Sequence, residues 1–231
     1  MMAPQAASAG SMLTSLTGEA GVAGMTQPVK ILILLTLLSL LPAIALTMTS
    51  FVRTVVVLSF LRQGIGAQQS PPSQIIVGLS LFVTAFVMSP VALQMKTDAI
   101  DPYSKGAITE TQAFEAAIVP IRSFMLRQTR QQDLQLFYNA SHADLPKTPD
   151  DVSIAIALPS FVVSELTTAF QMGVMVLLPF LVIDLAVASL LMSMGMMMVS
   201  PNTLSLPVKL LLFVLADGWN LVVGSLLSSF R

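Results

Sequence analysis

The chain has 231 residues, of which 55% are hydrophobic and only 10% are charged, and its mean hydropathy is +0.82. Soluble domains carry about a quarter charged residues, so this composition predicts an integral membrane protein. The net charge of −1 excludes a broad basic surface for nucleic acid. The lack of cysteine and the single histidine leave no thiolate or histidine-rich metal site, so we expect neither a metal nor a cofactor.

Residues 1–28 are mostly small residues with one charge, Glu19, and predict a flexible N-terminal segment. They lack the basic stretch and the apolar core of a signal peptide. A competing interpretation places such a core at residues 31–41, with a cleavage site after Ala45. Because the apolar character continues past Ala45, we favour a retained segment.

Residues 29–95 predict a first apolar helical hairpin. The stretch that ends at Leu61 would be roughly 46 Å long as one helix, whereas a hydrocarbon core is ~30 Å thick. We expect Pro42 to divide this stretch. Residues 64–73 contain glycines and two adjacent prolines and predict a turn, after which residues 74–95 form the second arm.

Residues 96–151 hold 14 of the chain's 23 formal charges, so we expect this segment to face water. Within it, Pro120 is expected to be the first residue of a helix that runs to about Tyr138. Residues 139–151 predict a polar loop, in which His142 is interpreted as a surface residue.

Residues 152–231 predict a second apolar hairpin with a methionine-rich loop. The part that ends at Val199 would be roughly 72 Å long as one helix, so we expect it to break or fold back, with Pro179 as the expected position. Residues 200–207 lie between two prolines and predict a turn. Residues 208–230 form the last apolar segment.

These lengths do not suit simple lipid-spanning helices. Broken helices at membrane depth are tolerated mainly where neighbouring protein satisfies the freed backbone, so we expect an all-α, membrane-derived protein of kinked hairpins that pack in a multi-subunit assembly. Arg53 and Arg62 flank one turn and Lys209 follows another. The positive-inside rule then places both turns in the cytoplasm and residues 96–151 outside, although Lys30 favours the opposite orientation.

Seven of the fifteen methionines lie in residues 172–198. Methionine fills irregular gaps, so these side chains can be interpreted as helix packing. The alternative rests on Met196, Met197 and Met198, which are consecutive and cannot all face one side of a helix. Repeated around a ring of subunits, this loop would form a soft apolar constriction that closes by dewetting and deforms around a passing chain.

Four ionisable residues lie in apolar segments, namely Arg53, Glu165, Asp184 and Asp217. An ionisable group in such a segment is a functional hypothesis and is expected to be paired. The alternatives are purely structural pairs or, for Asp217 beside Trp219, an interfacial anchor. We favour pairing and assembly contacts over a proton relay.

No enzyme is expected, because the chain has no Gly-rich phosphate loop, no Ser-His-Asp set and no HExxH motif. A small-solute or proton-coupled transporter would use Glu165, Asp184 and Asp217, and it predicts inverted repeats, which the sequence does not clearly show. A third hypothesis is a structural ring without a conducting pore.

Seven collinear stretches allow a more specific interpretation: TSFVR (49–53), VVVLSFLRQGIGAQQSPPSQ (55–74), GLSLFVTAFVMSPV (78–91), PIRSFMLRQTRQQDLQLF (120–137), LPSFVVSELTTAFQMGVMVLLPFLVIDL (158–185), MGMMMVSP (194–201) and ADGWNLVVGSL (216–226). From about residue 30 to the C-terminus, this pattern resembles the FliP family of flagellar biosynthetic proteins. The QQSPP turn and the DGWNLVVGSL ending are closer to this flagellar branch than to the injectisome (virulence) family SctR, which stays an alternative.

The resemblance implies a core subunit of the type III export gate in the flagellar basal body of the bacterial inner membrane. Several copies of the chain would join FliQ, FliR, other export-apparatus components and membrane lipid, and unfolded rod, hook and filament subunits would pass through the channel. The family's methionine gasket falls on Met196, Met197 and Met198, whereas Met172 and Met175 are expected in the core.

Two stretches depart from the family. FliP precursors typically begin with a cleaved signal peptide, which residues 1–28 do not resemble. The chain is then either a mature form or a protein that inserts through its first apolar segment. Residues 96–110 match poorly, and nothing is carried over to them.

Overall fold

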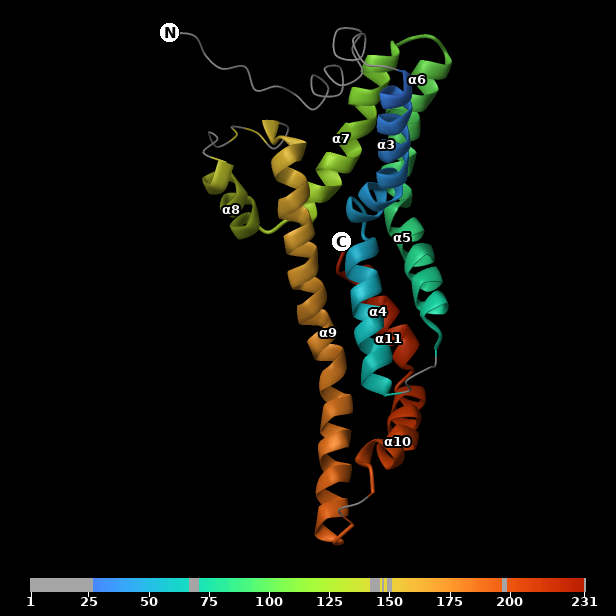
Figure 1. Ribbon diagram of the computed structural model, residues 1–231, viewed down its shortest axis with the longest axis vertical. Helices are drawn as coiled ribbons and strands as arrows, with labels where there is room; N and C mark the ends of the chain where they lie inside the picture. Colours follow the sequence, from blue (N-terminus) through green and yellow to red (C-terminus); the bar gives the residue numbers. More distant parts are fainter. Residues whose placement is uncertain are drawn as a thin grey trace. The chain divides into compact units, whose positions relative to one another are not determined.

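The computed structural model describes residues 27–66, 71–141, 146, 148, 151–196 and 199–230 (Figure 1). Every regular element in these ranges is a helix, which confirms the prediction of an all-α protein. The predicted flexible segment, residues 1–28, lies almost wholly outside the described residues.

The first apolar stretch forms helix α3, Gln27–Thr47, and helix α4, Phe51–Ile65. The prediction that Pro42 divides this stretch is wrong, because Pro42 lies inside α3 and the helix ends at Thr47. Two threonine side chains mark the true end: Thr47 Oγ1 donates to the carbonyl of Ile44 and Thr49 Oγ1 to that of Leu46, both at 2.9 Å. Threonine hydroxyls that bind nearby carbonyls in this way compete with the regular backbone pattern.

Residues 67–70 of the predicted turn lie outside the described residues. Helix α5 covers Ser73–Met95 and continues into a π-helical turn η1, Lys96–Ile100, and the short helix α6, Asp101–Ser104. Helix α7, Glu110–Gln128, starts ten residues earlier than predicted. Its start is a capping box, in which Thr109 Oγ1 accepts from the backbone N–H of Gln112 and the Gln112 side chain accepts from the N–H of Thr109. Pro120 therefore lies inside α7 rather than at its first position.

The expected single helix to Tyr138 is also wrong, because a separate helix α8 covers Gln131–Ser141. Thr129 is extended between the two helices. The break is satisfied by a residue far away in sequence: Ser164 Oγ accepts from the N–H of Arg130 at 3.0 Å and donates to the carbonyl of Gln128 at 3.3 Å. A tertiary contact therefore replaces the hydrogen bonds that a continuous helix would make.

Helix α9 is continuous over 40 residues, Ile154–Ser193, so the predicted break at Pro179 is wrong. A proline removes one helical hydrogen bond. In apolar surroundings a full break would expose several unsatisfied backbone groups, which costs more than one lost bond.

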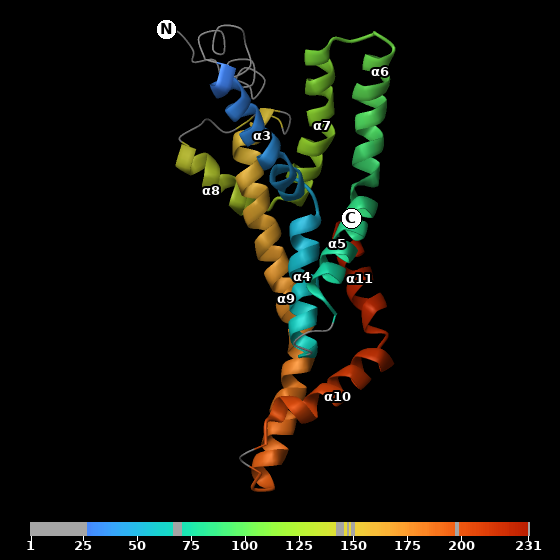
Figure 2. The ribbon, with the colours of Figure 1, turned by 45° about the vertical axis from the view of Figure 1, so that its right-hand side comes forward.

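Helix α10, Pro201–Leu215, begins directly at Pro201, so the predicted turn over residues 200–207 is largely helical. Proline is favoured at the first helical position, where its missing N–H has no helical partner to lose. Helix α11, Gly218–Ser228, follows after a bend of 63° (Figure 2).

Two helical stretches in the described part of the chain are long and apolar enough to cross a membrane, Ser73–Ser104 and Ile154–Ser193, with hydropathies of 2.2 and 2.6. The number rises to four if the pair Ile31–Thr47 and Phe51–Ile65 and the pair Pro201–Leu215 and Gly218–Ser228 each count as one broken span. Length and composition therefore agree with an all-α membrane protein.

The chain forms two compact units. The first unit comprises Met1–Thr49 and Met88–Ser164, and the second unit comprises Ser50–Val87 and Glu165–Arg231. In the first unit, Phe124 of α7 and Phe161 of α9 are buried and meet edge to face, with their ring centres 6.0 Å apart. Each unit thus combines parts of both apolar hairpins.

The second unit has a core formed by α4, α5, α9, α10 and α11. Its helices approach closely at glycines: a β-carbon at Gly173 would lie 2.3 Å from the ring of Phe60, and one at Gly64 would lie 2.6 Å from the ring of Phe180. The buried apolar residues of this core are Val57, Leu58, Leu61, Ile65, Ile76, Ala169, Phe180, Phe213, Val222 and Leu226.

Candidate functional site

The second unit contains a buried ion pair between Arg53 of α4 and Glu165 of α9. Arg53 Nε donates to Glu165 Oε2 at 2.9 Å, and Nη2 donates to Oε1. The two side chains are only 3% and 0% exposed. This two-point contact is the strongest geometry that an arginine and a carboxylate can form, and it joins residues 112 positions apart in sequence.

Two residues near the C-terminus, Ser229 and Phe230, also contact Arg53. Its Nη1 donates to the backbone carbonyl of Ser229 at 2.9 Å and to Ser229 Oγ at 3.0 Å. The guanidinium carbon lies 4.0 Å from the ring centre of Phe230, within cation–π range. Arg53 thereby joins α4, α9 and the end of α11. Nothing in the sequence pattern pointed to Ser229 or Phe230, because this contact has no local periodicity.

A second ion pair in the same unit links Asp184 of α9 with α10. Lys209 Nζ donates to Asp184 Oδ2 at 2.6 Å, and Ser205 Oγ donates to Asp184 Oδ1 at 2.7 Å. Both α10 residues are buried, whereas the Asp184 side chain is 28% exposed. In the sequence, Lys209 indicated only orientation and Ser205 gave no signal.

Asp217 has a different environment from the other two carboxylates. It is exposed, occupies the position before the first residue of α11 with φ 49°, and accepts a hydrogen bond from the Asn220 side chain at 3.1 Å. The three carboxylates of the transporter hypothesis therefore have three different partners. A proton-coupled site would need them to converge, and these contacts do not show such convergence.

The methionine-rich turn follows the end of α9. The N–H of Met196 donates to the carbonyl of Leu191 at 3.0 Å, and the N–H of Gly195 donates to the carbonyl of Met192 at 3.1 Å. Gly195 has φ 75°. These are the two bonds of a Schellman motif, in which a left-handed glycine ends a helix. The glycine thus turns the chain at a fixed point of the methionine run.

The described methionines of this turn are solvent-facing in the isolated chain. Met192, Met194 and Met196 are exposed by 63%, 64% and 46%. Met197 and Met198 lie outside the described residues. Of the two methionines expected in the core, Met172 packs against it, but Met175 is 71% exposed.

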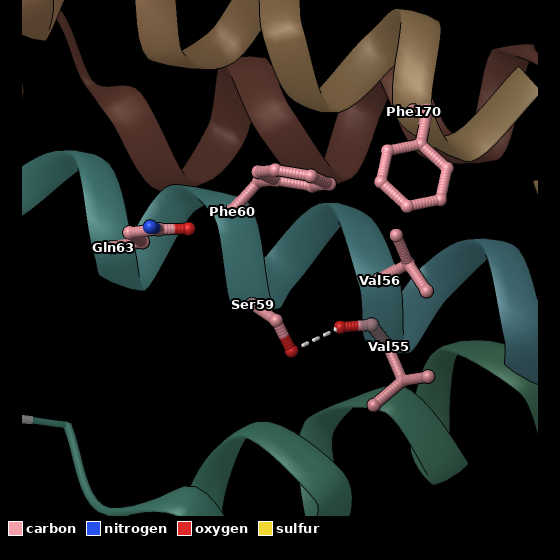
Figure 3. Close-up of a pocket in the computed structure, with 6 residues that line it drawn as sticks. All are labelled: Val55, Val56, Ser59, Phe60, Gln63 and Phe170. Atoms are coloured by element: carbon pink, nitrogen blue, oxygen red, sulfur yellow. Dashed lines mark hydrogen bonds between the residues drawn. The ribbon is translucent and has the colours of Figure 1, made fainter.

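A shallow groove lies along α4, lined by Val55, Val56, Ser59, Phe60, Gln63 and, from α9, Phe170 (Figure 3). The rings of Phe60 and Phe170 meet edge to face, 5.4 Å apart. Ser59 Oγ donates to the carbonyl of Val55 in its own helix at 2.6 Å. The groove is therefore mostly apolar. No group of three His, Asp or Glu side chains suited to a metal occurs in the described ranges.

Comparison with known proteins gives consistent matches. A sequence profile of the FliP family matches residues 34–226. A Flagellar biosynthetic protein FliP from Pectobacterium carotovorum is 52% identical over 82% of this chain and 74% of its own length. Proteins of the same name from Bacillus subtilis and Aquifex aeolicus are 48% and 44% identical to this chain, each over 82% of it. The alignments cover 86% and 80% of the lengths of these two proteins. These matches confirm the resemblance carried by the sequence motifs.

Proposed function

This chain belongs to the FliP family of the flagellar export apparatus, and on that premise we propose that it is a pore-forming subunit of the type III export gate. Several copies of the chain join FliQ and FliR in the bacterial inner membrane at the flagellar basal body. Unfolded rod, hook and filament subunits pass through the channel that they enclose. The chain conducts these substrates without catalysing a reaction.

The observation that carries this proposal is the exposure of Met192, Met194 and Met196 at the methionine-rich turn. Exposing large apolar side chains to water is unfavourable, so an exposed apolar loop of this kind marks an interaction site. In a ring of copies, such turns face one another and exclude water from the axis. Methionine side chains are flexible and polarizable. A plug built from Met196, Met197 and Met198 therefore closes the channel when no substrate is present and deforms when a polypeptide passes.

The remaining surface of the second unit supports an assembly rather than a single chain. Large apolar side chains on α9 and α10 are exposed, among them Val182, Leu185, Val214 and Leu215. An apolar surface of this extent requires protein or lipid against it. Neighbouring copies, FliQ, FliR and membrane lipid supply that cover.

The charged residues of the apolar segments hold the subunit together in this proposal. Arg53 and Glu165 join three helices, and Asp184 joins α9 to α10 through Lys209. The charges of these two pairs match within the chain, so the four residues fix the helices that carry the turn rather than relay protons.

The test is membrane leak in cells that express the whole export gate, with Met196, Met197 and Met198 all changed to alanine. We expect small solutes to leak through this variant at rest, because three flexible side chains per copy are lost from the constriction. A matched control changes Met175, Leu178 and Leu181 to alanine, which are exposed on α9 away from the turn, and it is expected to stay tight. An intact methionine variant without leak would return these residues to a packing role.

A further inference from the structure

We propose that a cavity in the first unit binds one acyl chain of a membrane phospholipid, and that the phosphate of this lipid lies beside Lys96. The cavity has a volume of about 320 Å³. It lies between the end of α3 with the turn that follows, the second half of α5, and Ile121 of α7. The inference is independent of the methionine-rich turn, which belongs to the second unit.

The lining of this cavity is apolar. Thr49 is the one lining residue with a polar side chain, and its hydroxyl donates to the carbonyl of Leu46 at 2.9 Å. Water in a cavity needs several polar partners, whereas an apolar cavity of only ~150 Å³ stays dry and binds benzene. We therefore expect an apolar ligand, and not water, in a space about twice as large.

The shape of the lining suits a flexible hydrocarbon chain. Three of the nine lining residues are methionines, Met48, Met88 and Met95. Methionine side chains are unbranched and fill irregular gaps, so they can follow a chain of variable conformation. Two further lining residues, Ala45 and Ala92, have small side chains that leave room. Because lipid tails are as apolar as this lining, a bound tail is stabilised by the dispersion contacts that an empty space lacks.

Helix α3 favours lipid over a partner helix at this position. Its described side chains are exposed, apart from the half-buried Leu46 and Thr47, and most of them are large and apolar. The hydroxyls of Thr36 and Ser39 both donate to carbonyls of α3 itself. Helices that associate in a membrane rely on small residues and on polar side chains that bond across the interface. The described surface of α3 offers mainly neither, so lipid is the cover that it suits.

Lys96 supplies a charge that complements the lipid phosphate. It directly follows the lining residue Met95, at the first position of η1, and its side chain is exposed. Among the described residues Lys96 forms no ion pair. The nearby carboxylate of Asp98 accepts a hydrogen bond from Thr97 Oγ1 at 3.0 Å. Lysine side chains at the ends of apolar segments extend to the lipid headgroups, and basic residues there attract anionic lipids.

The first measurement is photolabelling of the complete export complex in vesicles of phosphatidylethanolamine and phosphatidylglycerol. Part of the phosphatidylglycerol carries a diazirine in one acyl chain, and peptide mass spectrometry locates the label after illumination. We expect stronger labelling of Met48, Met88 and Met95 than of Leu32 and Leu35, which are exposed on α3 outside the cavity. Equal labelling of the two groups would show only general contact with lipid and would overturn the proposal.

Filling the cavity tests the site itself. Ala45→Phe should lower the labelling of the three methionines by at least about fivefold, the equilibrium factor that matches the low end of overpacking costs. The matched control Ala43→Phe makes the same change at an exposed residue of α3 that does not line the cavity, and it should label as wild type does. If Ala45→Phe does not assemble, Ala92→Leu decides the result, with the exposed Ala85→Leu on α5 as its control. A cavity variant that labels like its control would overturn the proposal.

Changes at Lys96 test the headgroup. Lys96→Gln should lower the labelling of the methionines by about fivefold, because one basic residue near an anionic lipid contributes roughly that factor. Lys96→Arg keeps the charge and should restore the labelling. Unchanged labelling in Lys96→Gln would overturn the assignment to a phospholipid. Labelling of the methionines in the isolated chain but not in the complete complex would mean that a partner subunit fills the cavity, which would also overturn the proposal.

Discussion

Changing Glu165 to glutamine should destabilise the second unit severely. The substitution preserves the size of the side chain but removes its negative charge. Of the two ion pairs described in this unit, only the one with Glu165 involves Arg53. The guanidinium would keep the two oxygens of Ser229 and the ring of Phe230. It would nevertheless stay almost fully buried after losing the carboxylate that matches its charge in this ion pair.

The expected cost follows from that burial. Breaking a buried ion pair by removing one partner costs about 3–5 kcal/mol. Because glutamine can still accept one hydrogen bond from Arg53, we expect about 3 kcal/mol for Glu165→Gln. Arg53→Met leaves the Glu165 carboxylate without its guanidinium and should lie at the upper end, about 5 kcal/mol. For a chain of this size, 3 kcal/mol corresponds to a fall in Tm of about 6–12 °C.

A double variant separates the ion pair from its surroundings. Replacing both Arg53 and Glu165 by methionine removes both buried charges, and such replacements are often neutral or stabilising. We therefore expect the double variant to be more stable than either single variant, with a coupling of at least about 2 kcal/mol in a double-mutant cycle.

The assay is unfolding of the purified chain in detergent, followed by the fluorescence of Trp219. It is the chain's single tryptophan and meets Phe213 edge to face at 5.5 Å in the same unit. The control is Asp133→Asn, which removes the more exposed pair with Arg130 in the first unit and should cost less than about 1 kcal/mol. A Glu165→Gln variant as stable as the control, or a double variant worse than both singles, would refute the reasoning.

Two further predictions concern packing and titration. Gly173→Ala should destabilise the second unit by about 1–3 kcal/mol, because its β-carbon would lie 2.3 Å from the ring of Phe60. The control Gly78→Ala, whose β-carbon has no atom within 4 Å, should be neutral or slightly stabilising. The same fluorescence assay compares the two variants, and equal changes in stability would contradict the close approach at Gly173. Burial, and then the charge of Asp151, raise the pKa of Tyr138 above its ordinary value, so in a Tyr103→Phe chain the absorbance of tyrosinate should develop only above about pH 10. A midpoint at or below that value in folded protein would count against the buried position of Tyr138.

The sequence was sufficient for the features that depend on composition and on local chemistry. A chain with 55% hydrophobic and 10% charged residues has to be covered by lipid or by partner protein. Local preferences also explain why α9 ends just before Gly195, in a left-handed turn, and why α10 begins at Pro201, but neither boundary was predicted, since residues 200–207 were expected to form a turn. The methionine run could be recognised in the sequence because its residues are contiguous.

Proline positions show where local reasoning fails. Pro42, Pro120 and Pro179 were each expected to begin or to interrupt a helix, and each lies inside one. The cost of a proline is one hydrogen bond and some steric strain. Whether the helix accepts that cost depends on what surrounds it, because in apolar surroundings the alternative is a longer stretch of unsatisfied backbone.

The sequence alone determined that this protein is helical and apolar, that its ionisable residues in apolar segments need partners, and that a methionine-rich turn follows the second long apolar stretch. Only the tertiary structure decided which partners these are. Arg53 meets Glu165 and Ser229 at separations of 112 and 176 positions, and Asp184 meets Lys209 and Ser205 across the turn. Pairing at such distances depends on which helix faces pack together, which no local pattern of residues encodes.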